Sequence, residues 1–258
     1  MWKRISHGLG PVEGKLVEQI YMEEREFETN AIRMQMDRSG NLEHSAPLYL
    51  TSSFVFEDAE DMRASFAEEK DRNIYSRYAN PNTSELISKV CQMEGAEAGF
   101  AFASGMAAVY STFAALLESG DHIVSCSSVF GSTLSLYQNF FPKWKISTDL
   151  FNVNDSAAAI EALIKPNTKV IYVESPTNPG VDILDLQMIG DIAAKHGLIL
   201  IVDNCFASPY LQQPISFGAH LVVHSATKLI DGQGRVLGGI TVGEATLIDK
   251  IYRFSRIS

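Results

Sequence analysis

Three short apolar runs decide the fold: KVIYVES at residues 169–175, LILIVD at 198–203 and AHLVVHS at 219–225. Each run is rich in Val, Ile and Leu, and each closes on a polar residue. Nearly continuous apolar runs are typical of strands that helices cover on both faces of a parallel sheet. We therefore predict that the three runs are strands of one largely parallel sheet.

The pattern continues on the N-terminal side of these runs. Further strand candidates are AGFAFA at 98–103, HIVSC at 122–126 and STDLFNV at 147–153. Helices are expected between the strands, at residues 82–95, 104–120, 155–164 and 184–197. The first should be capped by Asn82 or Thr83 and end at Gly95, and the second should begin after Ser104 with Gly120 just past its end. This alternation predicts a three-layer α/β/α domain, in which ligands bind outside the carboxyl ends of the strands.

The two ends of the chain differ from this middle part. Residues 1–80 are polar and charge-rich, and we expect an N-terminal arm there, with some helix around Glu18–Met36 and extended chain at 47–56. Residues 81–258 are expected to form the large domain, closing with a helix in 244–258. No second domain is expected after it.

Composition excludes several classes of protein. The 258 residues are 46% hydrophobic, enough for a sizeable core, and the net charge of −10 argues against a partner that is nucleic acid. No apolar run approaches the roughly 18 residues of a membrane helix, and the N-terminus lacks the apolar segment of a secretory signal. Three cysteines without metal-ligand spacing predict neither a disulfide scaffold nor a metal site. A cytoplasmic protein is the simplest interpretation.

Two features at strand ends and helix starts could bind a charged ligand. Ser104-Gly105-Met106 opens a helix, where free backbone N–H groups favour an anion, although an ordinary serine cap before a buried helix is the commoner explanation of such a pattern. Asp203 closes a buried strand, where a carboxylate needs a partner to stay charged. That partner is either a protonated ring nitrogen or the backbone of the next turn.

Two further features carry basic groups. Lys228 follows a strand in HSATK, with the hydroxyls of Ser225 and Thr227 beside it, and a desolvated lysine there would be a usable nucleophile rather than a surface charge. In YSRYANP, Tyr75 and Arg77 are two apart and would point to the same side of an extended chain, suited to one phosphate. The alternative is an exposed loop with an unremarkable arginine.

Together, YSRYANP, ASGMAA, ESPTNP, VDN and HSATK resemble the motif series of the Cys/Met-metabolism enzymes that depend on pyridoxal 5′-phosphate (PLP). The resemblance implies the aspartate-aminotransferase-like fold, fold type I, with PLP as cofactor. It implies that catalysis rests on Lys228, Asp203 and Phe130. It implies as cofactor-binding residues Tyr75, Arg77, Ser104, Gly105, Met106, Phe130, Asn178, Asp203, Ser225, Thr227 and Lys228.

Each residue takes its role from the family motif that it matches. Lys228 matches the lysine that carries PLP and Asp203 the acid that pairs with the pyridine nitrogen. The phosphate donors are matched by Gly105, Met106, Ser225 and Thr227, and Asn178 matches the residue near the phenolic oxygen of PLP. Tyr75 and Arg77 match the pair that reaches the phosphate of a neighbouring subunit. The resemblance thus implies an intersubunit segment within residues 1–80, a PLP-binding large domain at 81–258, and a homotetramer built as a dimer of dimers.

Departures from the family pattern narrow the expected activity. Phe130 stands where γ-lyases and cystathionine synthases usually have tyrosine, so stacking survives without the acid–base phenol. Ser132 stands where methionine γ-lyases place a cysteine, and Cys205 stands where many relatives have threonine. The stretches SVFGST, VDNC and GQGR are similar to the O-succinylhomoserine sulfhydrylase branch.

We therefore expect replacement at the γ-carbon of an O-acylhomoserine by sulfide, giving homocysteine in methionine biosynthesis. Alternatives are a cystathionine γ-synthase and a γ-elimination of the methionine or cystathionine γ-lyase type. Relatives continue into a smaller C-terminal domain with an arginine for the substrate carboxylate, which has no counterpart motif here. An alternative of another class is therefore a truncated, catalytically silent PLP-binding subunit.

Overall fold

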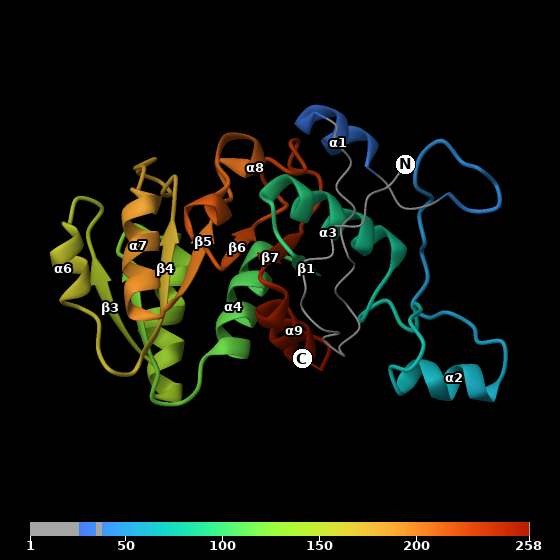
Figure 1. The fold of residues 1–258 in the computed structure, drawn as a ribbon, viewed down its shortest axis with the longest axis horizontal. Coiled ribbons are helices and arrows are strands. Elements are labelled where there is room, and N and C mark those ends of the chain that lie inside the picture. Colours follow the sequence, from blue (N-terminus) through green and yellow to red (C-terminus); the bar gives the residue numbers. More distant parts are fainter. Residues whose placement is uncertain (1–25, 35–37, 258) are drawn as a thin grey trace.

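The computed structural model describes residues 26–34 and 38–257. Within them lies one sheet of seven strands in the order β1-β7-β6-β5-β4-β2-β3 (Figure 1). The strands are β1 Ala98–Phe102, β2 His122–Cys126, β3 Ser147–Phe151, β4 Thr168–Glu174, β5 Ile199–Asp203, β6 Leu221–His224 and β7 Gly239–Gly243. Strands β2 to β6 pair in parallel, and β7 is antiparallel to both of its neighbours, β6 and β1.

The six strand predictions are confirmed, and so is the largely parallel sheet. Strand β7 was not predicted, because its segment, GITVG, is short and begins and ends with glycine. Glycine weakens a strand, yet every residue of β7 is buried in the sheet. Burial between β6 and β1 supplies the stabilisation that local propensity does not.

Helices cover both faces of the sheet, as the three-layer prediction requires. The helices are α1 Phe27–Arg33, α2 Ala59–Phe66, α3 Pro81–Glu94, α4 Gly105–Leu116, α5 Gly131–Ser135, α6 Ala157–Glu161, α7 Leu186–His196, α8 Ser208–Leu211 and α9 Ala245–Ser255. The chain also forms a short π-helix at Leu136–Phe140 and short 3₁₀ helices at Phe141–Trp144 and Pro214–Phe217. Right-handed crossovers place α4 and α5 on one face and α6 and α7 on the other. Contacts of α9 with α4, and of α3 with α8, assign those helices to the same two faces.

The helix boundaries correct two of the predicted caps. Helix α3 is capped by the side chain of Asn80, not by Asn82 or Thr83, because Pro81 occupies the first helical position. Its end at left-handed Gly95 is as predicted. Helix α4 is capped by Ser104 as predicted but ends at Leu116, short of Gly120. The closing helix is confirmed as α9.

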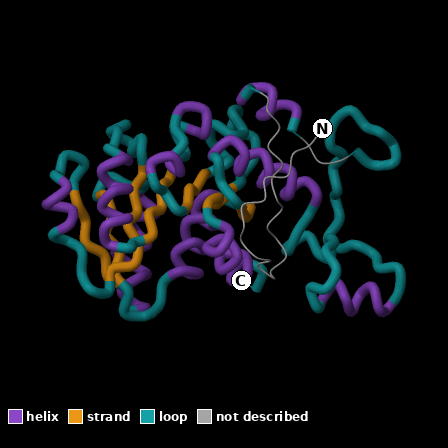
Figure 2. Tube along the Cα trace, in the orientation of Figure 1, coloured by secondary structure: helices purple, strands orange, loops and turns teal. Residues whose placement is uncertain are grey.

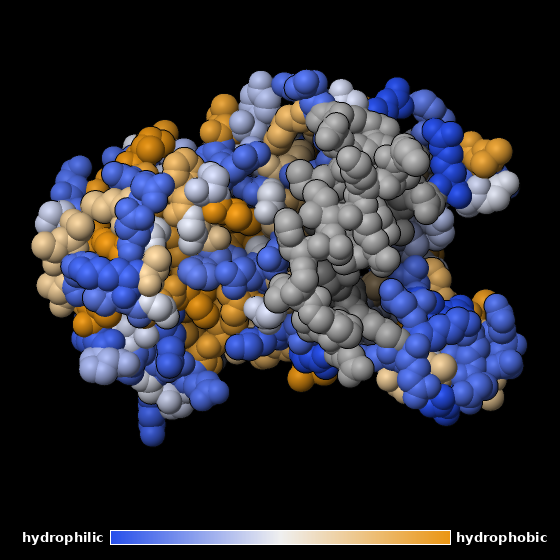
Figure 3. All heavy atoms as spheres, viewed as in Figure 1, coloured by the Kyte–Doolittle hydropathy of each residue, from blue (hydrophilic) through white to orange (hydrophobic). Residues whose placement is uncertain are grey.

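The segment before α3 lies apart from the sheet. Residues 38–58 and 67–80 are mostly loop, and α2 lies at the far end of the molecule from β3 (Figures 1 and 2). The face shown in Figure 3 is largely hydrophilic around α2. Several large apolar side chains of the segment are nevertheless exposed: Leu42, Leu48, Leu50, Val55 and Phe66. The predicted helix around Glu18–Met36 is confirmed for Phe27–Arg33, and residues 18–25, 35 and 36 lie outside the described residues.

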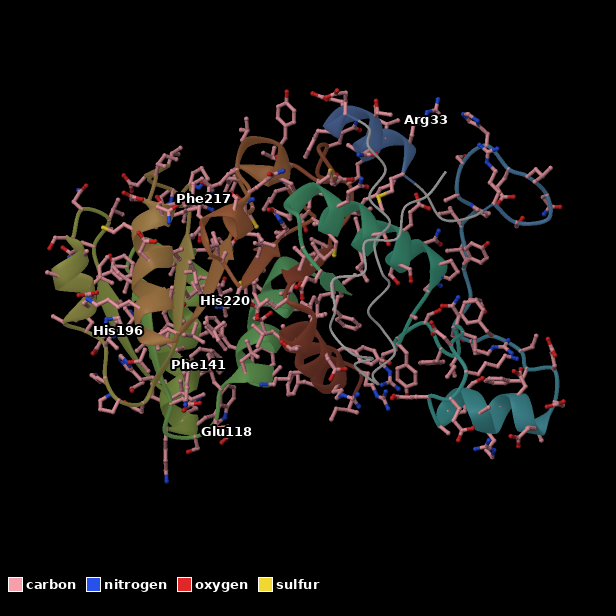
Figure 4. The ribbon with its side chains drawn as sticks, viewed as in Figure 1. Arg33, Glu118, Phe141, His196, Phe217 and His220 are labelled. Carbon is pink, nitrogen blue, oxygen red and sulfur yellow. The ribbon has the colours of Figure 1, made fainter. Side chains whose placement is uncertain are left out.

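The core lies between the sheet and its helix layers. Strands β4, β5 and β6 bury every residue of their central parts, and the aromatic cluster of Phe113, Tyr137, Phe141 and Tyr172 fills the α4 face. Phe141 is labelled in Figure 4. No helix within the described residues is long and apolar enough to span a membrane.

Gly190 permits α7 to pack against the turn before β6. A Cβ atom at this position would lie 2.0 Å from the carbonyl oxygen of Phe217, a residue labelled in Figure 4. The atom that it would meet is backbone, so neither partner can rotate away. Helix propensity alone would favour alanine at this position, and packing therefore decides in favour of glycine.

We predict that Gly190→Ala lowers the free energy of unfolding by about 2 kcal/mol despite the better helix former. Urea denaturation of the cofactor-free protein measures this. Gly131→Ala is the matched control, because an added Cβ there meets nothing within 4 Å. Equal stability of the two variants would contradict the packing argument.

Candidate active site

The candidate residues gather at the carboxyl edge of the parallel strands. Strands β4 and β5 end beside one another, with Glu174 opposite Asp203 in the register, and β6 ends at His224. Helix α4 begins at the same edge, directly after β1. This is the edge at which α/β sheets bind ligands.

The first turn of α4 presses against the end of β6. A Cβ atom on Gly105 would lie 2.6 Å from the Cβ of Ser225, and one on Gly239 would lie 2.1 Å from the carbonyl oxygen of Ser104. Two glycines therefore allow three backbone segments to meet there. The Ser104 hydroxyl accepts from the Ala107 amide at 3.1 Å, and the Gly105 and Met106 amides come before the first intrahelical donor. Beside the Ser225 hydroxyl, these amides form a site suited to an anion.

Asp203 lies next to this anion site and is almost completely buried. Its Oδ1 accepts from the Cys205 amide at 3.1 Å, and its Oδ2 accepts from the Tyr172 hydroxyl at 3.1 Å. Burial raises the pKa of Asp203, while these hydrogen bonds and nearby His224 oppose the rise. Of the two alternatives raised above, the structure shows the cap of the next turn, and the groups around Asp203 within the described residues do not offset its desolvation.

Glu174 is a second buried carboxyl beside Asp203, and its role was not predicted. Its Oε2 accepts from the Phe130 amide at 2.6 Å. Burial, followed by the charge of Asp203, raises the pKa of Glu174 to about 8. The charge of Asp203 and the desolvation by the surrounding protein therefore both disfavour the ionised form of Glu174. The glutamate stood within ESPTNP, where its position at the strand end was the available signal.

Cys205 joins the ends of β5 and β6. Its Sγ accepts from the Ser225 amide at 2.8 Å, while its own amide donates to Asp203. Burial raises the pKa of the Cys205 thiol well above its ordinary value. The thiol is therefore an uncharged link between the carboxyl and the anion site.

Lys228 lies in the turn that follows β6, and its amide donates to the Ser225 carbonyl at 3.1 Å. Its side chain is exposed, so the desolvation expected at a strand end is not provided by the described residues. Thr227 accepts from the Gly238 amide at 3.1 Å and thereby ties this turn to the start of β7. Its hydroxyl is engaged in the loop, whereas Ser225 lies against Gly105.

Phe130, Met106 and Asn178 border the same edge. Phe130 precedes α5 and is 41% exposed, so its aromatic side chain is accessible at this edge. Met106 contacts the Thr133 hydroxyl of α5 through its sulfur at 3.9 Å. The Asn178 amide hydrogen-bonds to Glu174 and lowers the pKa of that carboxyl, opposing its burial.

Tyr75 and Arg77 lie elsewhere. The predicted extended chain is wrong for this segment, because the amides of Tyr78 and Ala79 both donate to the Tyr75 carbonyl and form a turn. The Arg77 guanidinium still lies over the rings of Tyr75, at 5.5 Å, and Tyr78, at 5.0 Å. It also donates to the carbonyl of Arg256 at the end of α9. The structure therefore keeps the pair together but does not bring it to Lys228 through any contact among the described residues.

The edge as a whole carries complementary groups in one place. It combines an anion-binding helix end, a buried carboxyl, an exposed aromatic ring and a lysine one turn beyond the strand. This set suits a ligand that bears a phosphate, a protonated ring nitrogen and a carbonyl group. PLP has these three groups, so the residues fit the cofactor.

These features define a PLP-dependent enzyme of fold type I. The solved structure of a putative O-acetylhomoserine (thiol)-lyase from Campylobacter jejuni, which holds an N′-pyridoxyl-lysine-5′-monophosphate, superposes with a TM-score of 0.81 at 33% identity. The match covers 87% of this chain and 55% of that one. More narrowly, the chain belongs to the Cys/Met metabolism PLP-dependent enzyme family, whose model matches residues 28–257.

The named relatives include both a sulfhydrylase and a gamma-lyase. The chain is 44% identical to the O-succinylhomoserine sulfhydrylase of Pseudomonas aeruginosa over 89% of its length and 57% of that protein. It is 40% identical to an L-methionine gamma-lyase of Pseudomonas putida over 80% of its length and 51% of that protein. The chain therefore spans little more than half the length of the curated relatives it matches.

We predict that the raised pKa of Glu174 is visible as a pH dependence of stability. The folded-state pKa of Glu174, about 8, lies above its unfolded value, so its contribution is full in acid and is lost as pH rises toward 8. Glu174→Gln should make this fall shallower by as much as about 1.4 kcal/mol per pH unit, the value for one proton. Urea denaturation of the cofactor-free protein, from about pH 5 to about pH 8, measures how the free energy of unfolding changes with pH. Parallel profiles for the two proteins would refute the assignment.

Proposed function

We propose that the chain binds PLP on Lys228 and replaces the γ-substituent of O-succinyl- or O-acetylhomoserine by sulfide, giving homocysteine. The observation that carries the proposal is the position of Lys228, one turn past Ser225 at the end of β6, the strand that pairs with β5 and its terminal Asp203. The 44% identity to an O-succinylhomoserine sulfhydrylase supports the choice of substrate. Phe130 in place of a tyrosine supports replacement without a phenolic acid–base group.

Each part of the edge has a task in this reaction. PLP, when bound, supplies an electron sink for negative charge at the substrate α-carbon. The Gly105 and Met106 amides bind the phosphate, and Asp203 holds a proton at the ring nitrogen. Phe130 covers one face of the ring and excludes water from it.

Lys228 carries the proton transfers of the proposal. Its amine removes the α-proton of the substrate and returns a proton at the end of the turnover. Loss of a second proton, from the β-carbon, lets the acyloxy group leave from the γ-carbon as a carboxylate; hydrosulfide then bonds to the γ-carbon, and the β-carbon regains its proton. In elimination no nucleophile would replace the group lost from the γ-carbon, and hydrolysis of the remaining imine by water would give 2-oxobutyrate and ammonia. The 40% identity to a methionine gamma-lyase makes this the second candidate.

Tyr75 and Arg77 are proposed to complete the site of a neighbouring subunit. Within one chain the pair contacts its own segment and the end of α9, and the apolar chain around it, including Leu48 and Leu50, is exposed; both observations support the proposal. Guanidinium and phenol groups suit a phosphate oxygen. A homodimer, or two such dimers, would bring the pair to the phosphate donors of the partner.

Lys228→Ala should abolish covalent retention of the cofactor. After borohydride reduction of the PLP-loaded protein and proteolysis, mass spectrometry should find the cofactor on the peptide that contains Lys228. The variant should carry none, whereas Lys250→Ala, a lysine on α9, should be labelled like the wild type. Label on another peptide would overturn the assignment of Lys228.

Steady-state assays with O-succinyl- and O-acetylhomoserine separate the candidate activities. Replacement predicts homocysteine that depends on sulfide, with little keto acid. Keto acid formed equally with and without sulfide would favour elimination. A protein that holds PLP on Lys228 but gives neither product would be a silent cofactor-binding subunit.

Mixed oligomers test the intersubunit role of Arg77. Arg77→Ala and Lys228→Ala subunits should each be inactive alone, but a dimer with one of each contains one site with both wild-type groups. Refolding an equal mixture should restore about a quarter of the wild-type sites, as random pairing in a twofold dimer requires. No recovery would place both groups in the same subunit's site.

A further inference from the structure

Behind the candidate site lies a buried polar network that the reaction does not use. Glu94, the last residue of α3, accepts through Oε1 from Asn204 Nδ2 at 2.8 Å and lies 2.6 Å from His224 Nε2. Gln212 Nε2 donates to Asn204 Oδ1 at 2.9 Å, and Asn204 Nδ2 donates to the Gln212 carbonyl at 2.8 Å. We call Glu94, Asn204, Gln212 and His224 the rear network.

The rear network is costly as a purely structural device. Glu94, Asn204 and His224 are at most 2% exposed. Within the described residues, Glu94 Oε2 and His224 Nδ1 are buried without a hydrogen-bond partner. Well-packed apolar residues often match or exceed the stability that a buried acid–base pair provides. Orphaned polar atoms in such a pair therefore call for another explanation.

Two members of the network adjoin the site residues directly in the chain. Asn204 follows Asp203, and His224 precedes Ser225. Successive side chains of a strand point to opposite faces, so the network holds the backbone from the side away from Asp203 and Ser225. Asn204 also donates its amide to the Val223 carbonyl at 3.0 Å, which joins the two strand ends.

The network extends to a third strand end. Gln212 Nε2 donates to the carbonyl of Ser175 at 2.7 Å, the residue after Glu174 on β4. The ends of β4, β5 and β6 are thus tied, through Gln212, Asn204 and His224, to one carboxyl on α3. Helix α3 follows the segment of Tyr75 and Arg77 with only the residues 78–80 between them.

We propose that the rear network is a positioning device that sets the ends of β4, β5 and β6 in the register that PLP binding requires. The inference deepens the proposed function and rests on its cofactor-binding part alone. His224 also has an electrostatic effect at the site, because it lowers the pKa of Asp203 against the effect of burial. Glu94 and His224 are positioning residues, since neither reaches the site itself.

Three changes of different severity test the proposal in the full chain. Glu94→Gln keeps the shape and removes the charge. Gln212→Met opens the link to Ser175 at a partly exposed position, where folding is least at risk. The double change Glu94→Met with His224→Leu replaces the pair by apolar residues, which a merely structural role would tolerate.

His122 provides a matched control. It is completely buried, its Nδ1 lies 2.8 Å from Thr168 Oγ1, and it opens β2 at the amino edge of the sheet. His122→Asn and His224→Asn therefore remove equally buried imidazoles from opposite edges. Only the second should change the cofactor site.

The readouts are the dissociation constant of PLP, the circular dichroism of the bound cofactor and the stability of the cofactor-free protein. We expect Glu94→Gln, His224→Asn and the apolar double change each to weaken PLP binding about tenfold or more, which corresponds to about 1.4 kcal/mol. The dichroism should change in the same variants, and Gln212→Met should show a smaller effect of the same sign. His122→Asn should lower stability but leave both cofactor readouts unchanged.

Two results with the variants would overturn the inference alone. One is wild-type PLP affinity and dichroism in the apolar double variant, and the other is an equal loss in His122→Asn. A wild-type chain that binds no PLP would overturn the inference and the proposed function together. Normal PLP binding by the wild type without turnover would reject the proposed reaction and leave the network test intact.

Discussion

The close contact between the first turn of α4 and the end of β6 is the constraint on which the site depends. Gly105 can lie against Ser225, and Gly239 against Ser104, only because neither glycine has a side chain. The contact fixes where the free amides of the helix point, and it fixes them relative to the turn that bears Lys228. Asp203 and Glu174 take their places from the register of β5 with β4, so one edge collects groups from four separate segments.

Much of this arrangement follows from local sequence. Apolar runs such as LILIVD predict buried strands because, before the closing polar residue, they contain no side chain suited to a solvent-facing surface. Ser104 and Gly95 mark a helix start and a helix end through their local hydrogen bonding and backbone conformation. Strand β7 escaped prediction because its stability comes from its two neighbours and not from its residues. The Asn80 cap was not predicted because Asn82 and Thr83 are also suitable caps, whereas Pro81 at the first helical position makes Asn80 the capping residue.

The side-chain partnerships at the site were harder to foresee. The strand-end position of Glu174 was a local signal, but its raised pKa could not be foreseen, because it arises from burial in the folded chain and from the charge of Asp203 on another strand. The pairing of Glu94 with His224 likewise joins residues that only the fold brings together. The resemblance to a family assigned Tyr75 and Arg77 a partner, whereas within one chain they contact each other and the end of α9.

The antiparallel return of β7 has a consequence for Lys228. The loop of residues 225–238 leaves β6 at Ser225 and re-enters the sheet at Gly239, and both ends rest on the same turn of α4. Most of the entropy of closing the loop is therefore lost during folding and not when a ligand arrives. The amine of Lys228 belongs to a residue only three positions after Ser225, where the loop is anchored against α4. A carbonyl compound held at the helix end would meet this amine at a high effective molarity, which is a property of the loop's anchoring rather than of the lysine itself.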